Sequence, residues 1–155
     1  MRHMDTKIIY KVIVSFIAMV LLFPIISTAT AQERLSVKIE TANIRSGPGT
    51  TGYDILWQVE RYHPFRIMGK KGEWFRVKDF ENDEAWIHQS LLADIPSVIT
   101  IKNKCNVRSK PTTKSSKLFT AERGVPFKVL KRQGNWINVK HTDGDVGWIY
   151  KTLVW

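Results

Sequence analysis

The most constraining feature of this sequence is an internal duplication. The segment "ANIRSGPGT", residues 42–50, returns as "CNVRSKPTT", residues 105–113, at an offset of 63. Further along, residues 64–92 align without a gap on residues 126–154 at an offset of 62. One extra residue in the first copy, expected near Ile55–Trp57, accounts for the difference between the two offsets. Self-similarity at this period indicates two copies of a unit of about 60 residues, which is long enough to be a small domain rather than a solenoid repeat.

Each copy has the pattern of short strands joined by tight turns. The segment "LSVKI", residues 35–39, alternates apolar and polar side chains, and "TDGD", residues 142–145, is a strong hairpin signal. Several short strands within about 60 residues predict a small, highly curved barrel, because a flat sheet of that size would leave its edges uncovered. The predicted fold class is therefore all-β, with two tandem small β-barrels at residues 33–94 and 97–155. The short linker at residues 93–97 contains a proline, so the barrels are expected to pack on each other.

We interpret the repeated opening motif as part of the scaffold of each barrel. Alternation predicts that Ile44 and Val107 point into the barrels, which turns Arg45 and Arg108 outward. We interpret these arginines as scaffold residues that bridge to loop carbonyls. The alternative is a bidentate grip on a ligand carboxylate or phosphate.

The prolines of the two motifs predict different turns. Pro48 and Gly49 fit the central pair of a type II turn, in which Gly49 has a positive φ. The second copy has Thr112 in place of the glycine, and a β-branched residue resists positive φ, so a type I or open turn without positive φ at Thr112 is expected there.

The tryptophans that recur at identical positions are expected to be packing residues in each minimal core. Trp74 and Trp136 are expected to share a strand face with Val77 and Val139. The residues assigned to the structural motif are Asn43, Ile44, Arg45, Pro48, Trp74, Trp86, Asn106, Val107, Arg108, Pro111, Trp136 and Trp148.

Residues 1–31 have the three zones of an export signal. A short basic region precedes a charge-free apolar run, residues 12–26, and then the small-residue sequence Ala29-Thr30-Ala31. We predict a signal peptide at residues 1–31, with an uncleaved anchor as the alternative. The protein is then expected in the periplasm or cell envelope of a bacterium, with membrane contact only through the signal peptide.

Charge is distributed unevenly between the two copies. Residues 32–94 contain 9 Lys and Arg against 10 Asp and Glu, whereas residues 95–155 contain 12 against 3. A basic half favours an anionic partner, and export makes nucleic acid an unlikely one. The expected partners are a cell-wall polymer, another anionic envelope polymer, or an exported protein.

The chemistry-bearing residues do not form a catalytic pattern. The three histidines of residues 32–155 lack metal-ligand spacing, so no metal or other cofactor is expected. Cys105 and His141 are a conceivable nucleophile and base, but Cys105 stands where the first copy has Ala42. We therefore expect no enzyme and interpret Cys105 as a buried strand residue, with an intermolecular disulfide as the alternative.

Candidate ligand residues come from positions that differ between the copies or carry an exposed aromatic ring. Trp155 is expected either to close the second barrel or to meet a partner. The ligand candidates are Tyr53 and Trp57 in the first copy, and Lys110, Lys114, Lys117, Lys131 and Arg132 in the second copy.

Taken in order, the motifs carry a family resemblance. "NIRSGPGT…W…AWIHQSLL" and "NVRSKPT…W…GWIYKTL" resemble the bacterial SH3-like (SH3b) domain, whose pattern closes on Gly-Trp. The first copy departs from this pattern because it has Ala85 before its closing tryptophan. The tandem behind a signal peptide is similar to a group of exported bacterial proteins of unassigned function. The resemblance implies a non-catalytic binding module for a cell-wall component, with an adaptor that docks another envelope protein as the alternative and a hydrolase a distant third.

Overall fold

The computed structural model describes residues 33–155. The predicted signal peptide, residues 1–31, lies outside the described residues. Within the described part, no helix is long and apolar enough to cross a membrane.

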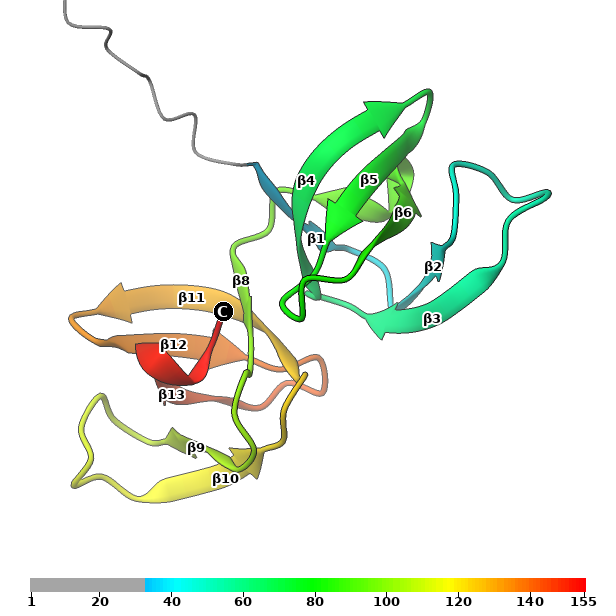
Figure 1. Ribbon diagram of the computed structural model, residues 1–155. Helices are drawn as coiled ribbons and strands as arrows, with labels where there is room; N and C mark the ends of the chain where they lie inside the picture. Colours follow the sequence, from blue (N-terminus) through cyan, green and yellow to red (C-terminus); the bar gives the residue numbers. More distant parts are fainter. Residues whose placement is uncertain (1–32) are drawn as a thin grey trace, which may run out of the picture. The chain divides into compact units, whose positions relative to one another are not determined.

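The first copy forms an antiparallel sheet with the strand order β3-β2-β6-β5-β4-β1-β7 (Figure 1). A single turn of 3-10 helix, η1 (Gln89–Leu91), joins its last two strands. The strands are β1 (Arg34–Val37), β2 (Thr41–Arg45), β3 (Ile55–Glu60), β4 (Pro64–Lys71), β5 (Trp74–Lys78), β6 (Glu84–His88) and β7 (Leu92–Ala93).

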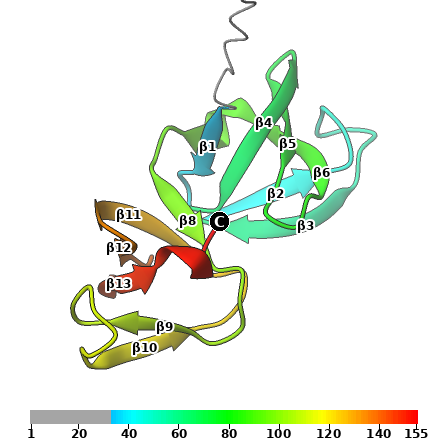
Figure 2. The same ribbon diagram turned by 60° about the vertical axis from the view of Figure 1, so that its left-hand side comes forward.

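The second copy repeats this connectivity in the order β10-β9-β13-β12-β11-β8 (Figure 2). The 3-10 turn η2 (Lys151–Leu153) matches η1, and a bridge between Thr100 and Val154 replaces the pairing of β7. The predicted all-β fold with two tandem SH3-like barrels is confirmed. The strands are β8 (Ser97–Ile99), β9 (Cys105–Arg108), β10 (Lys117–Ala121), β11 (Pro126–Gln133), β12 (Trp136–Lys140) and β13 (Val146–Tyr150).

A bulge interrupts the long strand of each barrel at the same place. The register shifts between Ile67 and Gly69 in β4, and between Val129 and Lys131 in β11. A bulge bends a strand and increases its twist. An eight-residue strand is thereby able to pair with two neighbours on opposite sides of a small barrel.

The two cores are built mainly from aliphatic side chains around one phenylalanine each. Phe65 and Phe127 are fully buried, and Ile44 and Val107 lie beside them as alternation predicts. Cys105 is also fully buried in the second core, where its thiol donates to Lys102 O at 3.0 Å.

Three of the four repeated tryptophans lie outside these cores, which corrects the expectation for their packing. Trp74 is half-buried and shares its strand face with Arg76, because side chains alternate in β5, while Val77 points to the core with Phe75. Trp136 is likewise half-buried, with its ring edge-on to another aromatic ring. Of the four repeated tryptophans only Trp148 is buried.

Candidate functional site

The opening loops contain the same turn in both copies. In the first copy Gly49 N donates to Gly47 O at 3.0 Å, and in the second Thr112 N donates to Lys110 O at 2.8 Å. A bond that spans three residues around a proline is an inverse γ-turn. Gly49 does not have a positive φ, so the predicted type II turn is wrong, whereas the prediction that Thr112 avoids positive φ is confirmed.

The shared arginines bond to equivalent carbonyls in these loops. Arg45 Nη1 donates to Tyr53 O at 3.3 Å, and Arg108 Nη1 donates to Ser115 O at 2.6 Å. These are the contacts expected of scaffold arginines. They also place Tyr53 and Ser115 at equivalent positions, so the extra residue of the first copy lies in the loop before Tyr53 and not near Ile55–Trp57.

The difference between Tyr53 and Ser115 explains why the two loop sequences differ. A Cβ atom on Gly47 would lie 2.1 Å from Cδ1 of Tyr53, so the tyrosine ring occupies the space that a side chain at residue 47 needs. In the second copy the Ser115 hydroxyl donates instead to the carbonyls of Lys110 and Thr112, at 2.9 Å each. Gly-Pro-Gly therefore accompanies a tyrosine, and Lys-Pro-Thr accompanies a serine.

Replacing Gly47 by alanine is expected to displace the Tyr53 ring and to lower the unfolding free energy by about 1 kcal/mol, because a methyl group cannot share that space. Chemical denaturation measures the change. In a Tyr53→Ser background the same Gly47→Ala substitution should have little effect, which a double-mutant cycle reports as coupling. Equal losses in both backgrounds would show that the ring is not the obstacle.

The two aromatic candidates of the first copy do not form one site. Tyr53 lies on the opening loop, whereas Trp57 in β3 packs against the first core and lines a groove of about 610 Å³. Residues of both barrels line this groove, among them His63, Phe80 and Arg123.

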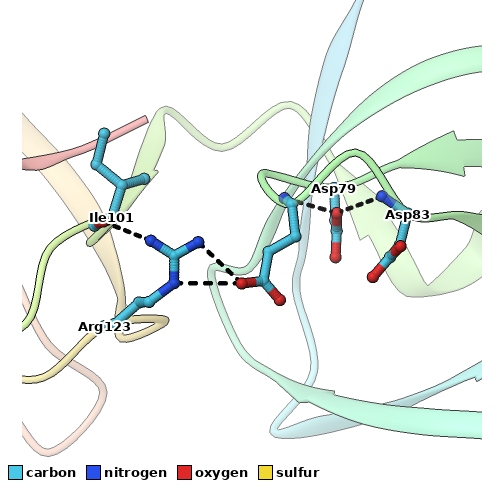
Figure 3. Close-up of polar contacts among 5 residues, drawn as sticks. Asp79, Asp83, Ile101 and Arg123 are labelled. Carbon is cyan, nitrogen blue, oxygen red and sulfur yellow. Dashed lines mark hydrogen bonds and ion pairs between the residues drawn. The ribbon is translucent and has the colours of Figure 1, made fainter.

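Arg123 crosses the groove and joins the barrels (Figure 3). Its guanidinium donates to Glu81 Oε1 from Nε at 3.2 Å and from Nη2 at 2.9 Å, while Nη1 donates to Ile101 O at 2.5 Å. The same guanidinium lies 5.3 Å from the centre of the Phe80 ring. Sequence analysis missed this bridge, because no local pattern relates residues 42 positions apart.

Three carboxylates gather beside this bridge, with their oxygens within 4.8 Å of one another. Asp79 Oδ1 accepts from the backbone amides of Glu81 and Asp83, at 2.8 and 2.9 Å, and so shapes the β5–β6 hairpin (Figure 3). Burial and the two neighbouring carboxylates raise the pKa of Asp79, against the two backbone bonds that lower it. Carboxylate oxygens are of the kind that bind hard cations. Here, however, Asp79 Oδ1 already stabilises the turn, and Glu81 Oε1 already belongs to the ion pair between the barrels.

His63 is, with Asp79, a buried titratable side chain of the groove. It is 7% exposed, its ring packs 4.7 Å from the Phe65 ring, and its Nε2 has no hydrogen-bond partner among residues 33–155. Burial lowers the pKa of His63 to about 4. The imidazole is therefore neutral at physiological pH.

The second barrel presents a row of directly paired residues that crosses five strands, here called the cationic row. Each member is the register partner of the next. The residues on both sides of Trp148 and of Asn138 are buried, as is Val107 beside Arg108, so the row points away from the core. The row consists of Lys117, Arg108, Trp148, Asn138 and Lys131.

The lysines of the cationic row are exposed and free of acidic partners. Lys131 Nζ lies 5.2 Å from the centre of the Trp148 ring, and no ion pair of the described residues involves Lys117 or Lys131. Lys110 and Lys114 lie on the adjoining β9–β10 loop. Arg132 is not part of this surface, because it pairs with the buried Ile137 and so points to the other side of β11.

The equivalent row of the first barrel lacks the two lysines. Ile55 and Gly69 occupy the places of the two lysines, and Arg76 Nε lies 3.8 Å from Glu84 Oε2. Arg45 and Trp86 remain at its centre. The duplicated barrels therefore share a scaffold and differ in the charge of this face.

Comparisons with known proteins identify the two copies. The family described as Bacterial SH3 domain matches residues 38–94 and 102–155. YrvJ of Bacillus subtilis, an N-acetylmuramoyl-L-alanine amidase by name, is 23% identical over 94% of this chain and 30% of its own length. LytH of Staphylococcus aureus, a cell wall amidase by name, is 27% identical over 49% of this chain and 26% of its own length.

Solved structures show more distant likeness. NlpC2 from Trichomonas vaginalis is 11% identical, with a TM-score of 0.36 over 83% of this chain and 49% of its own. An NlpC/P60 family protein from Bacillus cereus is 13% identical, with a TM-score of 0.36 over 79% and 56%. A TM-score this low supports no assignment.

The family assignment therefore rests on the matched segments. They cover most of residues 33–155, and the chain spans less than a third of the curated relatives it matches. Both segments coincide with the barrels that carry the repeated motifs. The chain belongs to the bacterial SH3 domain family, with two copies of the domain in tandem.

Proposed function

We propose that this protein is a non-catalytic binding module of the bacterial cell envelope, and that its second barrel binds peptidoglycan through the cationic row. The observation that carries the proposal is the pair of exposed, unpaired lysines, Lys117 and Lys131, on either side of Arg108 and Trp148. Stem peptides of peptidoglycan carry carboxylates, which ammonium and guanidinium groups attract.

Two further observations support an envelope ligand. The relatives that match these barrels are cell-wall amidases by name. The predicted signal peptide would export the chain to the compartment that holds this polymer. The Arg123 bridge would hold the two barrels together while one of them binds.

Replacing Lys117 and Lys131 together by glutamine is expected to weaken binding to purified peptidoglycan about tenfold at low salt. Exposed charges contribute about 0.2–1 kcal/mol each, so the removal of two gives an effect of this size. Binding of the unaltered protein should also weaken from 0.05 to 0.5 M salt, because the screening length shortens. Co-sedimentation with peptidoglycan stripped of covalently attached polymers measures both effects.

The charge-matched control is Lys38→Gln with Lys71→Gln, which removes two exposed lysines from the first barrel. It should retain binding. If the control loses as much affinity as the row variant, net charge and not the row is responsible. If the unaltered protein does not sediment at low salt, the proposal is wrong.

An adaptor that docks an exported protein is the second candidate, favoured by the edge strands. β3 and β10 each form one edge of a sheet, and both expose large apolar side chains: Ile55 and Leu56 in β3, and Leu118, which is 51% exposed, in β10. An exposed edge strand can pair with a strand of another protein.

The two candidates separate by stoichiometry. An adaptor should retain a single exported protein at one copy per chain, and Leu118→Ser, which adds no charge beside Lys117, should abolish that complex while leaving peptidoglycan binding unchanged. Size-exclusion chromatography of the reconstituted pair measures this. Polymer binding requires no such partner.

A further inference from the structure

Two arginines of the first barrel lie against an aromatic ring of the second. Arg34 Cζ is 3.9 Å from the centre of the Trp155 ring, and Arg66 Cζ is 5.1 Å from it. Arg34 and Arg66 are also direct register partners in β1 and β4. The backbone of Trp155 pairs with Ile99, which holds the ring in place.

Arg132 of the second barrel completes this group. Arg34 and Arg132 line the same recess of about 270 Å³, together with the hydroxyl-bearing Ser97. Burial, together with the positive charges of Arg66 and Arg132, lowers the pKa of Arg34. The three arginines and Trp155 are called the arginine cluster below.

The arginine cluster forms no ion pair among residues 33–155. Asp94 lines the recess, but no ion pair of residues 33–155 joins it to Arg34, Arg66 or Arg132. Like charges held together without partners oppose folding. A bound anion would remove this repulsion.

We propose that the arginine cluster is a binding site for phosphate groups of an anionic envelope polymer. One guanidinium suffices for a carboxylate. Here Arg34 and Arg66 lie over the same Trp155 ring, and Arg132 lines the same recess as Arg34. Several neighbouring guanidinium groups suit a group that presents several charged oxygens. The site is distinct from the cationic row, since Arg132 points to the opposite side of β11 from Lys131. It requires both barrels, because Arg34 and Arg66 come from one and Arg132 and Trp155 from the other.

In the test, the full exported chain is titrated with inorganic tripolyphosphate and with poly(glycerol phosphate), and tryptophan fluorescence monitors the binding. We expect a signal change that Trp155→Phe abolishes. The triple variant Arg34→Gln, Arg66→Gln, Arg132→Gln should bind both probes at least tenfold more weakly. Near-ultraviolet circular dichroism verifies that this variant is folded. If it is not, the single substitutions replace it, each with an expected loss of about threefold.

The matched control is Arg76→Gln, an exposed arginine outside the cluster, which should bind both probes like the unaltered protein. Unchanged binding by the triple variant would overturn the proposal. So would equal affinity for citrate, or binding to phosphatidylglycerol vesicles without binding to the polymer.

This experiment separates the two proposals. The Lys117 and Lys131 double variant should keep tripolyphosphate binding, and the arginine variants should keep their sedimentation with stripped peptidoglycan. Failure at one site therefore leaves the other testable.

Discussion

The unfolding free energy of this protein is expected to fall by about 2 kcal/mol between pH 7.5 and pH 5 through His63 alone. The pKa of His63 is about 4 in the folded protein, against an ordinary value of 6.5. Between these values the unfolded chain binds a proton that the folded protein excludes. The stability from the neutral imidazole is therefore present above pH 6.5 and is lost progressively as the pH falls toward 4.

Urea denaturation at both pH values, with and without His63→Phe, measures this contribution. Phenylalanine keeps the ring packing against Phe65 and removes both the titration and the unpartnered Nε2. Asp79 lines the same groove, and its raised pKa acts in the opposite sense, with stability lost as the pH rises above its ordinary 3.8. The variant should lose about 2 kcal/mol less than the unaltered protein on acidification. Identical pH dependence in His63→Phe would contradict the assignment.

Replacing Gly147 by alanine is expected to lower the unfolding free energy by about 1–3 kcal/mol. A Cβ atom there would lie 2.4 Å from Cγ1 of the fully buried Val107 and 3.1 Å from the carbonyl oxygen of Arg108. Since Gly147 does not have a positive φ, the penalty is steric. Thermal and urea denaturation measure the loss.

Gly69→Ala is the matched control, because Gly69 also lies in a strand without positive φ and an added Cβ would meet no atom within 4 Å. Its effect should stay within about 0.5 kcal/mol. The first barrel already has Ala85 at the place of Gly147. The tight contact of this position with the neighbouring strand is therefore specific to the second barrel. A stable Gly147→Ala protein would show that β9 can move away.

Much of the fold was predictable because it depends on local spacing. The duplication indicated two domains, and the turn residues Gly72, Gly134 and Gly144 do have positive φ. The apolar and polar alternation placed Ile44 and Val107 in the cores. Each of these features depends on residues a few positions apart, whose backbone preferences are nearly independent of the rest of the chain.

The candidate site was predictable only in part. Lys117 and Lys131 were both candidates, but their alignment with Arg108 and Trp148 depends on strand register and on the bulge in β11. The same reasoning grouped Arg132 with them, although the register places it on the other side of the strand. A shift of one residue reverses the face of every side chain, and composition does not specify it.

The sequence by itself determined the number of barrels, their strand content and the unequal charge of the two copies, since these follow from repetition, alternation and residue counts. Only the tertiary structure decided which charges meet. Arg123 with Glu81, and Arg34 and Arg66 with Trp155, join positions that no local pattern relates. The physical reason is that a contact between barrels depends on how two completed surfaces fit, and that fit exists only after each chain segment has folded.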